Sequence, residues 1–108
     1  MPQIKIVSSG SLTAAQQAAT AEFRHLSAGA LGVQVTGTFS ATMLVEVTMD
    51  GTNYNTYAFI NCASGATETS ITATGQYRTE LVGASLVRVR CSAYTSGTAV
   101  VTLVVLEN

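Results

Sequence analysis

Apolar and polar residues alternate along much of this 108-residue chain, as in β-strands that bury one face. Between Met43 and Met49 every odd position is apolar, whereas Glu46 and Thr48 are polar. The clearest strand runs from Leu86 to Tyr94. Its expected inward residues are Val87, Val89, Cys91 and Ala93, and its expected outward residues are Arg88, Arg90 and Ser92.

Shorter runs of the same kind predict further strands, over residues 31–39, 54–60, 71–73, 76–81 and 98–106. Turns that contain glycine separate several of them: Asp50-Gly51, Ser64-Gly65 in a polar loop over 61–69, and Ser96-Gly97. About seven or eight short strands joined by such turns predict an all-β fold, an antiparallel β-sandwich or jelly roll.

The last predicted strand is apolar on both faces. Ala99, Val101, Leu103 and Val105 form one face, and Val100, Val104 and Leu106 lie on the other. A strand with two apolar faces lies either in the centre of a sandwich or against another subunit. We therefore expect Val100, Val104 and Leu106 to be candidates for a subunit interface.

Residues 11–26 fit two patterns. Apolar residues fall at helical spacing (Leu12, Ala15, Ala19, Phe23 and Leu26), and the alanines of this segment favour a helix. Ala19, Ala21 and Phe23 also alternate with polar residues, which favours a strand over 19–26 after a turn at Gln16-Gln17. The strand is the preferred interpretation, and the helix stays open.

The composition excludes several classes of protein. Apolar residues make up 47% and charged residues only 10%, which argues against a disordered chain and against a coiled coil. Five basic and six acidic residues give a net charge of −1, so neither nucleic acid nor an anionic membrane surface is an expected partner. No apolar run is long enough for a membrane span, and no secretory signal is evident.

The length suits a single domain over 1–108. Its expected core includes Phe23, Phe39, Phe59, Tyr57, Met43 and Met49.

Candidate catalytic and metal-binding residues are few. His25 is the only histidine and Asp50 the only aspartate, and no nucleophile-elbow motif is present, so we expect no catalytic residues. Asp50 to Asn53 is expected to form a hairpin turn and not a calcium loop. Cys62 and Cys91 lack metal-ligand spacing and are expected to be small buried side chains with free thiols, although a disulfide stays open. Neither a metal nor a cofactor is expected.

Other polar residues have simple structural explanations. Glu22, Glu46 and Glu80 fit solvated strand faces. Arg88 and Arg90, with Arg78 near them, could hold a phosphate or a partner's carboxylate, although a polar strand face explains them more simply. Four tyrosines could stack on sugar rings: Tyr54, Tyr57, Tyr77 and Tyr94.

Four segments together resemble a known family. They are 33–42 (VQVTGTFSAT), 49–54 (MDGTNY), 75–78 (GQYR) and 87–98 (VRVRCSAYTSGT). This pattern is similar to a β-sandwich domain of tailed-bacteriophage virion proteins, over roughly residues 31 to 106. The segment 87–98, which is a closing hairpin in that family, carries the most specific part of the resemblance. Tyr54 stands where the family usually has Trp.

The resemblance implies a structural role in the virion. A small free-standing sandwich is similar to capsid decoration (cement) proteins, which stabilise the head by bridging capsid subunits. The implied partners are the phage major capsid protein and a second or third copy of this chain, assembled in the host cytoplasm. The segment 1–26 is then expected to be an extended N-terminal arm that reaches a neighbour. The alternative is a tail, baseplate or fibre component that binds a host surface glycan through exposed tyrosines (Tyr54, Tyr57 or Tyr94).

Overall fold

The computed structural model describes residues 4–22, 28–82 and 84–107, and all the secondary-structure elements within them are β-strands, joined by turns and loops. The strands are β1 (Ile4–Leu12), β2 (Ala18–Glu22), β3 (Ala28–Thr48), β4 (Tyr54–Thr56), β5 (Phe59–Asn61), β6 (Thr67–Glu68), β7 (Gly75–Val82) and β8 (Leu86–Glu107). All pairings between them are antiparallel. This confirms the all-β, sandwich-like fold predicted from the alternating pattern. The described ranges contain no helix long and apolar enough to cross a membrane.

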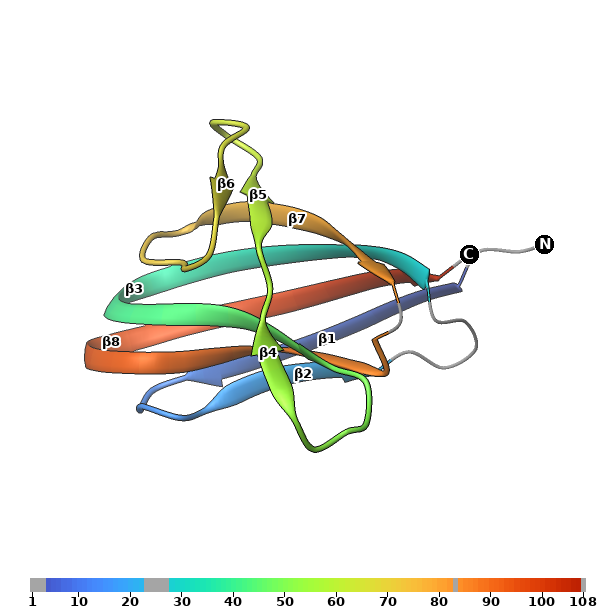
Figure 1. Cartoon of the computed structure of the whole chain (residues 1–108). Coiled ribbons are helices and arrows are strands. Elements are labelled where there is room, and N and C mark those ends of the chain that lie inside the picture. The colour runs from blue at the N-terminus through green and yellow to red at the C-terminus, as the bar shows by residue number, and fades with distance from the viewer. Residues whose placement is uncertain (1–3, 23–27, 83, 108) are drawn as a thin grey trace.

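Two long strands, β3 and β8, form the frame of the fold. They pair from Gly29 opposite Glu107 to Thr48 opposite Leu86, and both bend sharply midway (Figure 1). The bend folds the pair into two layers. The first layer has the order β1-β8-β3-β7-β5-β6 and contains residues 28–36 of β3 and 99–107 of β8. The second layer contains β2, residues 86–91 of β8, residues 43–48 of β3, and β4.

The bend corrects the predicted strand boundaries. Residues 31–39 and 43–49 were expected to be separate strands, and Ser96-Gly97 was expected to be a hairpin turn, but β3 and β8 run through these positions. Their register shifts between Ser40 and Ala41 and again between Thr42 and Met43. Extra residues of this kind bend a strand and increase its twist without ending it. Since both strands bend together, their pairing continues around the corner.

The core lies between the two layers. Each layer contributes alternate residues, all at most 5% exposed, among them Leu31, Val33, Val35, Met43, Val45, Val87, Val89, Cys91, Val101, Leu103 and Val105. This confirms the predicted alternation of β8 up to Cys91. Ala93 is exposed, contrary to prediction, because the register shift precedes it. Met49 is 76% exposed, also contrary to prediction, because it lies beyond the last pair of β3 with β8. Phe59 is buried edge-to-face on Tyr77, with ring centroids 5.3 Å apart.

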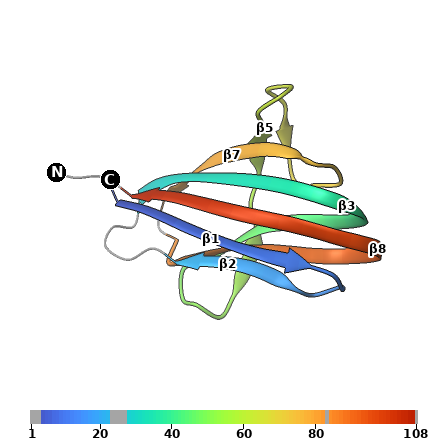
Figure 2. The ribbon, with the colours of Figure 1, turned by 180° about the vertical axis from the view of Figure 1, so that it is seen from behind.

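The N-terminal segment belongs to the sheet. β1 pairs with residues 99–107 of β8, and β2 pairs with residues 86–90 (Figure 2). The strand interpretation is confirmed for Ala18–Glu22, after a turn in which Gln16 has a φ of 73°. The described part of this segment, 4–22, therefore contains a pair of strands that lie on β8 of the same chain. Phe23 and the rest of 23–27 lie outside the described residues.

Three shorter segments differ from prediction. Residues 54–60 divide into β4 and β5, because the chain passes there from the second layer, on β3, to the first layer, on β7. The predicted loop over 61–69 contains β6, which pairs with β5 around a turn at Gly65. Residues 71–73 form no strand, and Ile71 makes one isolated bridge to Met43.

Candidate functional site

A charged cluster occupies the outer face of the second layer. Arg88 and Arg90 each donate a hydrogen bond from Nε to Oε1 of Glu46, at 2.8 and 2.9 Å, and Arg90 Nη2 donates to Oε2 at 3.0 Å. Glu46 is only 6% exposed, so the prediction that it lies on a solvated face is wrong. The guanidinium of Arg88 also lies over the ring of Tyr54, 3.6 Å from its centroid. We call these four residues the Glu46 cluster.

The Glu46 cluster ties together segments that are distant in sequence. Arg90 Nη1 donates to Oε1 of Gln16 in the turn before β2, so the cluster joins that turn to β3, β4 and β8. The hydrogen bond from Arg90 keeps the pKa of Glu46 below its ordinary value, against the opposing effect of burial. The carboxylate that these arginines hold therefore comes from the chain itself. Arg78, which was expected near them, lies in the first layer opposite Gly32.

We expect Glu46→Gln to lower the free energy of unfolding at neutral pH by about 1–2 kcal/mol, because two half-buried guanidiniums lose their counter-charge. The pKa of Glu46 is depressed in the folded chain, so its stabilisation is present above the ordinary pKa of 4.5 and is lost as the pH falls through the folded value. Urea unfolding at pH 3 to 7 should therefore show a shallower acid decline in the variant. Glu68→Gln on β6, which forms no ion pair with any other described residue, is the matched control. Equal pH profiles for wild type and Glu46→Gln would contradict the assignment.

Asp50 organises the turn between β3 and β4. Its Oδ1 accepts hydrogen bonds from the backbone N–H groups of Thr52 and Asn53, both at 2.8 Å, and its Oδ2 accepts one from Asn53 Nδ2 at 2.7 Å. These bonds, among which that from Asn53 N–H has the largest effect, hold the pKa of Asp50 well below its usual range. The predicted hairpin turn is confirmed, and the carboxylate is engaged by its own turn. Among the described residues, no group of three or more His, Cys, Asp or Glu is placed to hold a metal ion.

The tyrosines do not gather into one exposed cluster. Tyr77 is 4% exposed, in the core. The hydroxyl of Tyr57 donates to the backbone oxygen of Glu80 at 2.9 Å, and that of Tyr94 donates to the backbone oxygen of Gly97 at 2.8 Å. Tyr54 belongs to the Glu46 cluster, in the other layer from Glu80. The four tyrosines therefore form no shared aromatic platform.

Three further candidates are His25, Cys62 and Cys91. His25 lies outside the described residues. Cys91 is fully buried with a free thiol, as predicted, whereas Cys62 is free and exposed, which corrects the expectation that it is buried. Cys62 lies just after β5, at the margin of the first layer, where no layer covers it.

The outer face of the first layer is apolar where the strands approach the termini. Val104 and Leu106 lie there, as the sequence predicts, and the third predicted interface residue, Val100, is 37% exposed on the same face near the bend. Val7, which is 58% exposed, lies on β1 directly opposite Val104. The sequence interpretation missed Val7, although the alternation of Ile4 and Ile6 with Lys5 was a usable strand signal for this segment. We call Val7, Ala30, Gly32, Val104 and Leu106 the apolar face.

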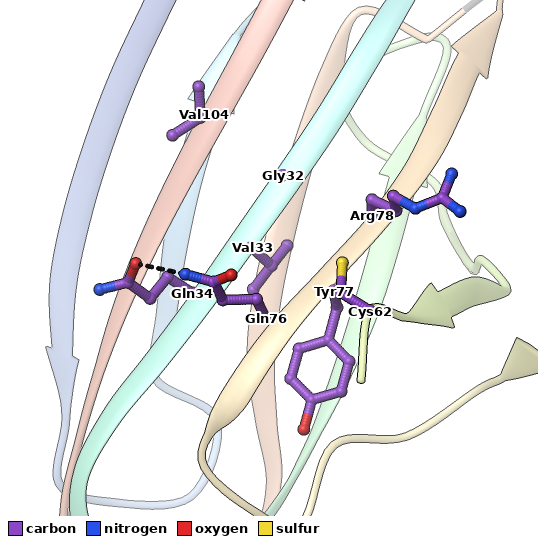
Figure 3. A pocket seen from close by; sticks show the side chains of 8 residues that line it. All are labelled: Gly32, Val33, Gln34, Cys62, Gln76, Tyr77, Arg78 and Val104. Atoms are coloured by element: carbon purple, nitrogen blue, oxygen red, sulfur yellow. Dashed lines mark hydrogen bonds between the residues drawn. The ribbon is translucent and has the colours of Figure 1, made fainter. Parts of the chain in front are cut away.

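Two hollows lie beside this face. Gly32 lies between Val104 on β8 and Arg78 on β7, with a hollow of about 230 Å³ around it (Figure 3). The hydrogen bond from Gln76 Nε2 to Gln34 Oε1, 3.2 Å long, crosses one side of it. A second hollow, of about 460 Å³, is lined by Ala30, Leu31, Tyr57, Ile60, Arg78, Thr79 and Glu80. The face thus presents large side chains on β8 and, at Gly32, a hollow over β3.

Comparison with known proteins shows a likeness to a solved structure. No protein-family model matches the chain, and no curated protein matches its sequence. The crystal structure of the SPBc2 prophage-derived protein YomS is similar, with a TM-score of 0.67 and 16% sequence identity, covering 94% of this chain and 95% of that one. At this identity the likeness concerns the fold. The chain therefore shares its all-β fold, over nearly its whole length, with a prophage-derived protein.

Proposed function

We propose that this protein is a structural component of a bacteriophage virion, a capsid decoration protein that stabilises the head by bridging capsid subunits. The observation that carries the proposal is the fold shared over 94% of the chain with a prophage-derived protein. The strand motifs that resemble tailed-phage virion proteins support the same assignment. In this proposal the protein acts by binding, and no residue has a catalytic role.

The apolar face gives the proposal a physical basis. Val7, Val104 and Leu106 place apolar surface where an isolated sheet would carry polar side chains. With only 10% charged residues, the chain also presents few long flexible side chains that would lose entropy on association. An oligomer of such domains contacts several capsid subunits at once, so weak individual contacts add up through effective concentration.

Co-sedimentation with expanded capsids that lack this protein tests the proposal. We expect saturable binding at high copy number over the whole shell, and a higher temperature of capsid disruption, because each bound oligomer links neighbouring subunits. Bound copies per particle would be measured on gels, and disruption by light scattering during heating.

The opposite outcome also has a defined meaning. Absence of binding, or a few copies at a single vertex, would reject the decoration role and favour a tail, baseplate or fibre component. A glycan-binding screen of the purified protein would then be the next measurement. The dispersed tyrosines of this chain make decoration the better supported of the two roles.

A further inference from the structure

The apolar face is self-complementary in shape. Across the first layer, Leu106 on β8 lies beside Ala30 on β3, and Val104 lies beside Gly32. Large side chains therefore follow β8, and the smallest ones follow β3. Figure 2 shows these two strands running side by side across the middle of this layer, with β1 and β7 flanking them.

A two-fold axis between β8 and β3, parallel to the strands and lying in the plane of contact, would place β8 of one copy over β3 of another. Each Val104 would then project toward the hollow at Gly32 of the other copy, and each Leu106 would lie over Ala30, beside the second hollow. The same operation places β1 over β7, so that the exposed Val7 would be covered by the aliphatic stem of Arg78.

The charges at the margins match under the same operation. One row of paired residues crosses the layer from Lys5 on β1, through Leu106 on β8 and Ala30 on β3, to Glu80 on β7. Lys5 and Glu80 are both exposed and lie at opposite margins of the face. The two-fold axis brings Lys5 of each copy against Glu80 of the other. This forms two ion pairs, each between a lysine and a glutamate. An isologous interface requires this kind of self-complementarity.

The area of the face approaches that of a stable interface. Nine residues of strand at about 3.3 Å each, across four strands about 4.8 Å apart, make a face of roughly 600 Å² before side-chain relief is counted. Stable protein pairs bury about 800 Å² per partner. The uneven side-chain surface and the adjoining β5 add to the flat area and bring it close to this size. Two twisted sheets pack face to face in this aligned manner in ordinary β-sandwiches.

We propose that the apolar face binds a second copy of this chain in a two-fold symmetric dimer, with Val104 and Leu106 of each copy seated over Gly32 and Ala30 of the other. This inference deepens the proposed function and rests on it for the biological role of the dimer. The dimer itself is a property of the purified chain and is tested without capsids.

Sedimentation velocity of the wild-type protein over a concentration series is the first measurement. We expect a reversible monomer–dimer equilibrium. A monomer at all concentrations, or a trimer, would overturn the proposal, because the two-fold operation pairs exactly two faces.

Gly32→Val tests the shape of the interface. A Cβ atom at residue 32 would lie 3.8 Å from Cβ of Val104, an ordinary contact, so the variant should fold. Its side chain would fill the hollow, and we expect dimerisation to weaken roughly 100-fold or to vanish, as at a central interface position. Val104→Lys should act alike, whereas Met49→Lys, at an exposed residue outside the face, is the matched control. Dimers of wild-type strength in a folded Gly32→Val variant would place the interface elsewhere.

Charge reversal tests the geometry. Lys5→Glu and Glu80→Lys should each weaken the homodimer, by about two- to tenfold, because each puts like charges together at both margins. In an equimolar mixture, the heterodimer of the two variants regains both opposite-charge pairs, and its affinity should return to that of wild type. Absence of this rescue would reject the proposed axis.

The two levels of the proposal fail differently. If the wild-type protein dimerises, Gly32→Val abolishes the dimer, and the wild type does not bind capsids, the proposed interface stands and the decoration role is rejected. If a strictly monomeric wild-type protein binds capsids, the decoration role stands and the proposed dimer is rejected.

Discussion

Gly97→Ala should destabilise the folded chain by about 3 kcal/mol or more, a large share of the stability of a small domain. Gly97 has a φ of +86°, a conformation that costs any residue with a Cβ atom. A Cβ atom there would also collide with the backbone oxygen of Thr38 and would lie 2.7 Å from Cα of Phe39 on the paired strand. Because the collision is with backbone, the corner formed by β3 and β8 would have to open.

Gly65→Ala separates the two causes. Gly65 has a φ of +76° in the turn between β5 and β6, and nothing lies within 4 Å of an added Cβ atom. It should therefore show only the cost of the backbone conformation, about 1 kcal/mol. Urea denaturation with parallel circular dichroism and fluorescence would measure both variants. Equal losses of stability would show that crowding at the corner contributes nothing.

Gly97 also explains why the sequence pattern predicted shorter strands in place of the long strand β8. A glycine with positive φ in a polar context is typical of a hairpin turn, and Ser96-Gly97 was interpreted in that way. The local signal is the same when a strand bends and continues, because both conformations need the left-handed region. What decides between them is a partner far away in sequence: Phe39 lies opposite Gly97, and β3 bends at the same place. Alternation, by contrast, depends only on neighbouring residues, so it correctly predicted the inward face of residues 99–105.

The candidate surfaces were predictable to a similar degree. The second apolar face of the last strand pointed to Val104 and Leu106, and the structure places both on one outer face. Gly32 gave no such signal. Its lack of a side chain leaves a hollow beside Val104 and Arg78, and only the fold brings these residues together. Glu46 was interpreted as solvated because a single glutamate in a strand usually is. Its burial depends on Arg88 and Arg90, more than 40 residues further along the chain.

Leu103→Ala should lower the free energy of unfolding by about 3–4 kcal/mol, through lost burial and the cavity left behind. Leu103 is fully buried at the middle of the first layer, where Ser8 and Val33 lie opposite it on the two flanking strands. These strands are held by their own pairing and cannot collapse into the space. The urea midpoint should fall with little change in slope, and a loss under about 1 kcal/mol would mean that the site does relax.

Val104→Ala, one residue further along β8, is the matched comparison because its side chain points to the opposite face of the sheet. Truncation there leaves no internal cavity, so monomer stability at low protein concentration should change by less than about 1 kcal/mol. In the proposed dimer, however, Val104 seats over the hollow of the partner copy, so its truncation should weaken dimerisation. Leu103→Ala should lower the stability of the monomer but leave dimerisation unchanged under conditions where the chain is folded. If both variants lost stability and dimerisation in equal proportion, the dimer would depend on folding alone and not on the outer face of β8.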